Sequence, residues 1–236
     1  MASVSSSGYA LVTEFGTLLV APHTAPGTNV RAPIMRMGAS IGIEAPLVMV
    51  ATGPRHAAAV TIGGDIYFWG YNGYGEQGSA PVAHVGVPAC MPRSVFGGAR
   101  ALQVALGLAH TLVLVEGGRV FCCGAGDYGR LGLASTADTH ALTPVDAEAF
   151  CAVPAVFVAA GFYSSAAVRA DGCVWTWGLN RYGQLGLGDL EDRLAPAPLA
   201  RFGVCLRRVS APRVWVCAAC LCLRRVSVWA ARAAAA

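Results

Sequence analysis

The pattern of apolar and turn-forming positions repeats along this chain with a period of about 54 residues. Sliding the sequence against itself by this distance aligns glycines in five columns, each three copies deep. With 29 Gly in 236 residues, chance would give about 0.1 such column. The aligned glycines are Gly53, Gly107 and Gly161; Gly64, Gly118 and Gly172; Gly70, Gly124 and Gly178; Gly75, Gly129 and Gly183; and Gly78, Gly132 and Gly186. The chain is therefore built from consecutive copies of one structural unit.

Each copy contains two short apolar runs joined by a pair of turn-forming residues. The first runs are 57–62, 111–115 and 165–168, the turn pairs are Gly63-Gly64, Gly117-Gly118 and Asp171-Gly172, and the second runs are 66–69, 120–123 and 174–177. Such pairs tolerate the positive φ that a tight hairpin needs. We expect one β-hairpin in each copy.

Two further features complete the predicted unit. The column Asn72, Gly126 and Asn180 follows each hairpin, and these residue types predict a turn in the left-handed region. Connectors of about 25 residues come next, in which Phe96 aligns with Phe150. These connectors have room for the remaining strands of a four-stranded sheet.

A four-stranded sheet of this size cannot bury both faces alone, so the copies must stack against one another. A period near 54 residues favours a β-propeller over shorter solenoid repeats. We predict an all-β propeller with three clear blades at about 48–101, 102–155 and 156–203, and an incomplete ring. Residues 1–47 contain a degenerate fourth blade or a linker, because residues 8–20 read as a worn hairpin. Residues 204–236 form a low-complexity tail rich in Arg, Cys and Ala.

The repeat resembles that of the regulator of chromosome condensation family. Three stretches carry the resemblance: Val50-Ala-Thr-Gly-Pro-Arg-His-Ala-Ala-Ala-Val60, Gly107-Leu-Ala-His-Thr-Leu112, and Trp177-Gly-Leu-Asn-Arg-Tyr-Gly-Gln-Leu-Gly-Leu-Gly188. Two columns depart from the pattern, with Ser164 in place of His56 and His110, and Cys123 in place of Trp69 and Trp177. The resemblance implies a seven-bladed propeller fold, of which this chain is a partial or truncated member.

The resemblance implies a non-enzymatic module that binds another protein. Two alternatives are guanine-nucleotide exchange on a Ran-like small GTPase and a truncated gene product without activity of its own. The residues expected to contact a partner are Arg55, His56, His110, Tyr74, Tyr128, Arg181 and Tyr182. For the two histidines, an internal hydrogen-bonding role is the favoured interpretation.

One short motif raises a further comparison. The stretch Gly53-Pro-Arg-His56 is similar to the Gly-Trp-Arg-His stretches of the plant ultraviolet-B photoreceptor of this superfamily. Pro54 stands where light sensing would need tryptophan, so we predict no photoreceptor role.

Charge and cysteine content narrow the class of protein. Residues 1–200 contain 10 Arg and all 13 acids (net −3), whereas residues 201–236 contain 7 Arg and no acid (+7). The repeats are thus mildly acidic, and only the tail offers a nucleic-acid signal. The strand-like positions of Cys122, Cys123 and Cys173 predict small buried side chains. We expect an intracellular protein, cytoplasmic or nuclear, without a membrane span, which can self-associate through open blade edges.

No catalytic or cofactor site is predicted. Gly73-x-Gly75-x-x-Gly78 and Gly124-x-Gly126-x-x-Gly129 match the dinucleotide fingerprint, but neither precedes a helix, so both are interpreted as blade turns. The tail cysteines Cys205, Cys217, Cys220 and Cys222 have weak zinc-site spacing. We therefore expect no catalytic residue, no cofactor and no metal.

Overall fold

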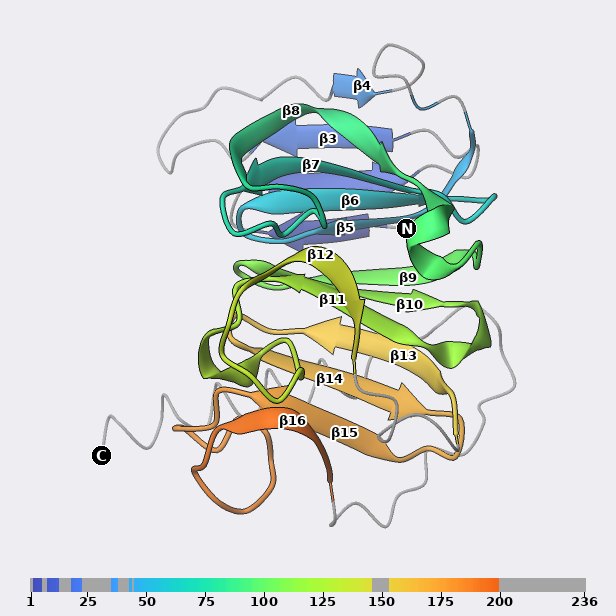
Figure 1. The fold of residues 1–236 in the computed structure, drawn as a ribbon. Coiled ribbons are helices and arrows are strands. Elements are labelled where there is room, and N and C mark those ends of the chain that lie inside the picture. Colours follow the sequence, from blue (N-terminus) through green and yellow to red (C-terminus); the bar gives the residue numbers. More distant parts are fainter. Residues whose placement is uncertain are drawn as a thin grey trace.

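The computed structural model describes residues 2–5, 8–12, 18–22, 35–37, 43, 45–145 and 153–199. These residues form four antiparallel sheets, each of four strands that follow one another in sequence (Figure 1). The strands are β1 (Ala2–Ser5), β2 (Gly8–Val12), β3 (Leu18–Pro22) and β4 (Met35–Met37) in the first sheet; β5 (Leu47–Thr52), β6 (His56–Thr61), β7 (Ile66–Asn72) and β8 (Val82–Met91) in the second; β9 (Ala101–Leu106), β10 (His110–Val115), β11 (Val120–Gly124) and β12 (Thr139–Pro144) in the third; and β13 (Ala155–Ala160), β14 (Ser164–Arg169), β15 (Val174–Gly178) and β16 (Arg193–Pro198) in the fourth. The all-β prediction is confirmed.

The predicted hairpins form the middle of the second, third and fourth sheets. In each, the first predicted run pairs antiparallel with the second, as β6 with β7, β10 with β11 and β14 with β15. The turn glycines Gly64, Gly117, Gly118 and Gly172 all have positive φ, as the turn signals predicted. The connectors supply the two outer strands of each sheet, and also the short 3-10 turns η2 (Arg93–Phe96) and η4 (Asp127–Gly129). A third such turn, η3 (Glu116–Gly118), lies at the β10–β11 hairpin.

At the column Gly70, Gly124 and Gly178, the backbone conformation and the lack of room for a Cβ both require glycine. Gly124 lies opposite His110 in the β10–β11 register and has a φ of 109°. A Cβ at this position would lie 2.4 Å from the Ala109 carbonyl oxygen and 2.8 Å from the His110 Cα. Gly70 and Gly178 occupy the same place in the neighbouring sheets, with φ of 98° and 103°. A side chain is thus excluded where the third strand passes the start of the second.

The prediction of a left-handed turn at the asparagine column was wrong. Asn72 and Asn180 are absent from the residues with positive φ, and Gly126 has a φ of −94°. The asparagines instead organise the following loop through their side chains. The Asn72 Oδ1 accepts a hydrogen bond from the Gln77 amide at 2.9 Å, and the Asn180 Oδ1 accepts one from the Leu185 amide at 2.9 Å. Side-chain to backbone bonding, not backbone strain, explains asparagine at this column.

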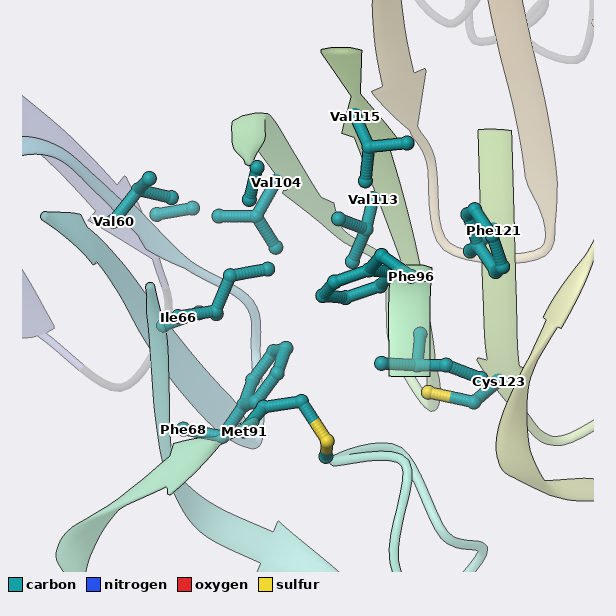
Figure 2. Close-up of a cluster of buried hydrophobic side chains, with 14 of the residues drawn as sticks. Val60, Ile66, Phe68, Met91, Phe96, Val104, Val113, Val115, Phe121 and Cys123 are labelled. Atoms are coloured by element: carbon teal, nitrogen blue, oxygen red, sulfur yellow. The ribbon is translucent and has the colours of Figure 1, made fainter. Parts of the chain in front are cut away.

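The second and third sheets pack face to face through one apolar core (Figure 2). The second sheet contributes Val60, Ile66 and Phe68, and the third contributes Val113 and Phe121. Phe96 of η2 fills the space between the sheets, and its ring meets the Phe121 ring edge-on at 5.2 Å. Full burial of each such side chain stabilises the fold by about 1.5–3 kcal/mol. Stacking therefore supplies the burial that one sheet could not achieve.

The other sheets pack in the same manner. A second core joins Leu112, Leu114 and Val120 of the third sheet to Val158 and Trp177 of the fourth. The predicted worn hairpin at residues 8–20 is present as the antiparallel pair β2–β3, within a complete sheet whose strands β1 and β2 lie against β5. Figure 1 shows the first and fourth sheets at opposite ends of the stack.

The cysteines divide between core and surface. Cys122 and Cys123 are buried as predicted, and burial raises the pKa of the Cys122 thiol to about 12. The expectation for Cys173 was wrong, because it lies in the exposed turn before β15. Phe150 and the tail, with its four cysteines and its six arginines, lie outside the described residues. Across the described residues no helix is long and apolar enough to span a membrane.

Candidate functional site

Two loops from each repeated sheet meet at one end of the stack. In an antiparallel sheet of consecutive strands, the connection between strands one and two and that between strands three and four lie on the same side. Backbone hydrogen bonds join the two loops in each sheet: Tyr71 N to Arg55 O at 2.9 Å, Ala125 N to Ala109 O at 2.8 Å, and Leu179 N to Tyr163 O at 2.9 Å. We call this side the loop end; it comprises residues 53–55, 71–81, 107–109, 125–138, 161–163 and 179–192.

The opposite side carries the tight turns between the second and third strands. We call it the hairpin end; it comprises residues 62–65, 116–119 and 170–173. All seven residues predicted to contact a partner lie on the loop end or on the first residue of the adjoining strand. Five of them have accessible side chains: Arg55, Tyr74, Arg181 and Tyr182 are exposed, and Tyr128 is partly exposed.

Tyr128 forms the centre of one surface group. Its ring lies 5.3 Å from the Arg181 guanidinium carbon and 5.9 Å from that of Arg130. The Tyr163 ring meets it edge-on at 5.7 Å, and Arg130 stacks over Tyr163 at 4.7 Å. We call Tyr128, Arg130, Tyr163 and Arg181 the tyrosine–arginine group. It joins loops of the third and fourth sheets, so neighbouring blades build it together.

The backbone of Tyr128 is held in an unfavourable conformation. Its φ of 61° and ψ of 10° lie in the left-handed region, which is costly for a residue with a Cβ. The positions of its neighbours are fixed: the Arg130 Nη2 donates to the Asp127 Oδ2 at 2.7 Å, and the Gly126 amide donates to the Asp138 Oδ1 at 2.9 Å. Strain of this kind persists where the surroundings determine the conformation, and it concentrates at functional sites.

Arg55 belongs to a second group, on the second sheet. Its guanidinium carbon lies 5.4 Å from the centre of the Tyr71 ring, and the Tyr71 and Tyr74 rings are 6.3 Å apart. Tyr74 is 39% exposed. An arginine stacked on tyrosine keeps its outer N–H groups available to a carboxylate or carbonyl.

The structure adds residues to the candidate surface that sequence reasoning missed. Phe162 is 61% exposed on the loop end, beside Tyr163. Both occupy columns of the motif around Arg55, since Pro54 aligns with Phe162 and Arg55 aligns with Tyr163. Comparing these columns in all three copies would have found them. Arg130 is buried and supports the rings of Tyr128 and Tyr163 from below the surface, and no pattern in one copy indicates this role.

The two predicted histidines lie inside the stack. The His56 Nε2 lies 3.0 Å from the Thr111 Oγ1, and the Thr111 hydroxyl donates to the Glu76 carbonyl oxygen at 2.6 Å. The hydroxyl has one proton to donate, so His56 is the donor to it through Nε2–H. His56 is 2% exposed, and burial lowers its pKa to about 4. The neutral ring therefore links the second sheet to the third.

His110 repeats this arrangement one sheet further along. Its Nε2 lies 3.0 Å from the Ser165 Oγ, which donates to the Arg130 carbonyl oxygen at 2.7 Å. Burial first, and then the charges of Arg130 and His56, lower its pKa to about 3. We call each set of histidine, hydroxyl and carbonyl an inter-sheet relay. Because both rings are buried, neither is available to a partner, and His56 and His110 are internal hydrogen-bonding residues.

The glycine motifs lie in blade loops. Gly75 has a φ of 76°, and a Cβ there would lie 2.6 Å from the Cα of His140 on the next sheet. The second motif runs through η4, a turn of three residues and not a helix that could bind phosphate. Within the described ranges no three His, Cys, Asp or Glu side chains gather as metal ligands. Gly75, Gly78 and Gly129 allow close packing against the next sheet, and Gly73, Gly124 and Gly126 allow close approaches within their own sheets.

The repeated four-stranded sheets, each packed on the next, place the chain among the β-propeller repeat proteins. Two family models, both described as the regulator of chromosome condensation (RCC1) repeat, match it: one at residues 117–168 and 171–218, the other at residues 102–130 and 155–184. The chain therefore contains RCC1 repeats over the matched residues.

Solved structures and a curated relative agree with this assignment. The chain superimposes on human WBSCR16 with a TM-score of 0.73 at 23% identity, covering 84% of this chain and 52% of that one. For Prp20p of Saccharomyces cerevisiae the TM-score is 0.71 at 19% identity, covering 86% and 51%. In sequence it is 36% identical over 158 residues to the ultraviolet-B receptor UVR8 of Arabidopsis thaliana, covering 66% of this chain and 35% of the receptor. The chain thus spans about a third of that relative and about half of each solved structure.

Proposed function

We propose that this chain is a protein–protein interaction module that binds its partner through the loop end. One observation carries the proposal: loops of the second and fourth sheets present exposed aromatic and arginine side chains on one side, and the third sheet adds the partly exposed Tyr128. Tyr182 is 73% exposed and Phe162 is 61% exposed. Tyrosine and arginine are enriched in protein interfaces, because they bury a large area and keep a polar tip.

The tyrosine–arginine group supports this proposal through its order. Arg181 is held on the Tyr128 ring and lies 3.7 Å from the Asp192 carboxylate, yet its side chain is 67% exposed. A side chain already held in place loses less conformational entropy when a partner binds. Phe162 offers an apolar anchor on the same side of the stack. Such a surface suits a partner with an acidic residue close to an apolar one.

The proposal is a binding role without catalysis and without a cofactor. Prp20p has been described by its binding to Gsp1p and histones, so a protein partner is in keeping with this fold. Light sensing is not part of the proposal, although UVR8 is a relative, since Pro54, Leu108 and Phe162 form a column without tryptophan. An intracellular location, cytoplasmic or nuclear, stays a prediction.

A paired-variant capture experiment tests the loop end. The tagged chain and the double variant Arg181→Ala/Tyr182→Ala are used to capture proteins from the source cells, with quantification by mass spectrometry. We expect the variant to lose a defined set of proteins by about tenfold or more, as when interface residues worth about 1–2 kcal/mol are removed.

The matched control removes an arginine and an apolar side chain from outside the loop end. Ile62 is 59% exposed on the hairpin end, and Arg93 on η2 pairs there with Asp65. The variant Arg93→Ala/Ile62→Ala should capture the same proteins as the unmodified chain. Equal capture by all three proteins would contradict the proposal, as would loss in the control alone.

The alternative function is guanine-nucleotide exchange on a Ran-like small GTPase. It is favoured by the likeness to Prp20p, a protein that binds Gsp1p. Exchange would accelerate release of a fluorescent guanine nucleotide from the purified GTPase. A release rate unchanged at a large excess of this chain would remove exchange and leave the docking role standing.

A further inference from the structure

The outer strand of the second sheet is long and open on one side. β8 has ten residues, whereas the corresponding strands β12 and β16 have six each. It is last in the strand order of its sheet, and among the described strands it pairs with β7 alone. Seven of its ten residues are exposed, all except Val85, Pro88 and Met91. Figure 1 shows β8 as a long curved strand at the edge of its sheet. Such a strand presents a row of backbone N–H and C=O groups to another chain.

The first six residues of β8 lack the charged residues and prolines that usually protect such an edge. Residues 82–87 read Val-Ala-His-Val-Gly-Val, and the first proline of the strand is Pro88. Edge strands are normally protected by charge or by proline. The fourth strands of the other sheets have such residues: Arg36 in β4, Pro144 in β12, and Arg193, Pro196 and Pro198 in β16.

The exposed side chains of β8 favour strand pairing. Val87 is 64% exposed and Val82 is 48% exposed, in a sheet that buries Val50 and Val60 almost completely. Valine is β-branched, so it adopts the extended backbone readily and packs well beside a cross-strand neighbour. Both the backbone and the side chains of residues 82–87 are therefore suited to a further strand.

We propose that β8 pairs antiparallel with β8 of a second copy of this chain, joining two four-stranded sheets about a two-fold axis. Such an axis brings each strand segment against its own counterpart, so charged residues would meet like charges there. Residues 82–87 carry no acid or arginine, and the strand is therefore compatible with itself. Pro88 has no amide hydrogen, so the paired stretch ends before it. The contact closes on itself and gives a dimer.

The dimer depends on concentration. One strand pair gives a few backbone hydrogen bonds over a small area, which belongs with the weaker class of interfaces, below about 1,200 Å². Sedimentation equilibrium of the purified chain from about 1 to 100 µM covers the range in which such contacts form. We expect the mean mass to rise from one chain toward two across this range.

Charge variants at Val82 and Val87 test the strand contact. When residues 82–87 of two copies pair about the axis, Val82 of one strand lies opposite Val87 of the other. The double variants Val82→Lys/Val87→Lys and Val82→Glu/Val87→Glu should each stay monomeric, because like charges then lie opposite each other. An equimolar mixture of the two should dimerise again, since each lysine then meets a glutamate, and this recovery also shows that both variants are folded. The control is Ile62→Lys, which places a lysine at an exposed residue on the hairpin end and should dimerise as the unmodified chain does.

Loss of the dimer in both double variants with recovery in the mixture supports pairing through β8. A chain that stays monomeric up to about 100 µM overturns the proposal. A dimer that persists in Val82→Lys/Val87→Lys, or that fails to return in the mixture, overturns it too, because association then uses another surface. Arg181→Ala/Tyr182→Ala should dimerise normally, so this test is independent of the loop end.

Discussion

Glu76 is an unusual residue in this structure, because its carboxylate is buried with one oxygen unpaired. It is 0% exposed; its Oε2 accepts a hydrogen bond from the Tyr74 amide at 2.9 Å, and its Oε1 has no partner in the described part of the chain. Burial raises the pKa of Glu76, against the opposing effects of backbone hydrogen bonds and of Arg55. Gln184 holds the same column in the fourth sheet and accepts from the Tyr182 amide at 2.9 Å. Glutamate and glutamine thus accept the same backbone hydrogen bond in the second and fourth sheets, whereas the third sheet has Arg130 at this column.

We expect Glu76→Gln to stabilise the protein at neutral pH by about 1–3 kcal/mol, since it removes a buried charge and keeps the acceptor. The folded-state pKa of Glu76 lies above its unfolded value of 4.5, so the folded protein binds the proton more tightly. The unmodified chain should accordingly gain stability relative to the variant as pH falls through the raised pKa toward 4.5. Urea unfolding at pH 7 and at pH 4.5 measures both effects.

Glu116→Gln is the control for this variant. Glu116 lies on the hairpin end, its side chain is 46% exposed, and the substitution changes the net charge by the same amount. It should leave the free energy of unfolding nearly unchanged at both pH values. If Glu76→Gln behaved like this control, the carboxylate of Glu76 would not be a source of instability.

The relay histidines should shift stability in the opposite direction. Their folded-state pKa values of about 4 and about 3 lie below the ordinary 6.5, so stability is full above pH 6.5 and is lost as pH falls toward the folded values. His110→Gln keeps an N–H near the Nε2 position but does not titrate. We expect the advantage of the unmodified chain over His110→Gln in urea unfolding to shrink between pH 7 and pH 5.

His84→Gln provides the comparison, because it removes an exposed imidazole instead of a buried one. The difference in unfolding free energy between His84→Gln and the unmodified chain should not show the pH dependence expected for His110→Gln. If the difference in unfolding free energy between the unmodified chain and His110→Gln stayed constant from pH 7 to pH 5, folding would not lower the pKa of His110.

At the scale of the elements, each hairpin depends on a glycine where the backbones of its two strands approach most closely. Gly124 faces both a conformational and a steric restriction. Gly117, in the β10–β11 turn, has a φ of 82°, but a Cβ added there would meet no atom of the described residues within 4 Å. Gly124→Ala should cost about 3 kcal/mol or more, and Gly117→Ala about 1 kcal/mol. Thermal unfolding of both variants measures the difference. Equal losses would mean that the close approach of the Ala109 carbonyl is relieved without cost.

Sequence periodicity predicts the elements well and their mutual contacts poorly. The glycine columns and hairpins follow from local backbone demands that every copy shares, and they were predicted. The asparagine column was misread, because Asn72 and Asn180 act through side-chain bonds to residues further along the loop. Cys173 was misread because a turn beside a strand looks apolar in sequence. Backbone turns and hairpins can be predicted from the residues of one copy, whereas the distant partners of a side chain cannot.

At the scale of the whole molecule, the candidate surface exists only because sheets stand next to each other. The tyrosine–arginine group takes Tyr128 from the third sheet and Arg181 from the fourth, and no single copy contains it. The repeat period predicted that the sheets stack, but not which side chains of one meet those of the next. The relays show the same dependence, since each takes its histidine from one sheet and its hydroxyl from the following one.

Each inter-sheet relay needs a histidine from one repeat and a hydroxyl from the next, so the residues of a repeat determine which neighbours it can join. Of the three repeats with described side chains, the one around the third sheet has both halves, the donor His110 and the hydroxyl of Thr111. The second sheet has His56 followed by Ala57, and the fourth has the hydroxyls of Ser164 and Ser165 without a histidine. Tandem copies of the middle repeat would recreate the same junction at every boundary, because each copy would supply what its neighbour needs. The middle repeat is therefore the natural template for a longer array.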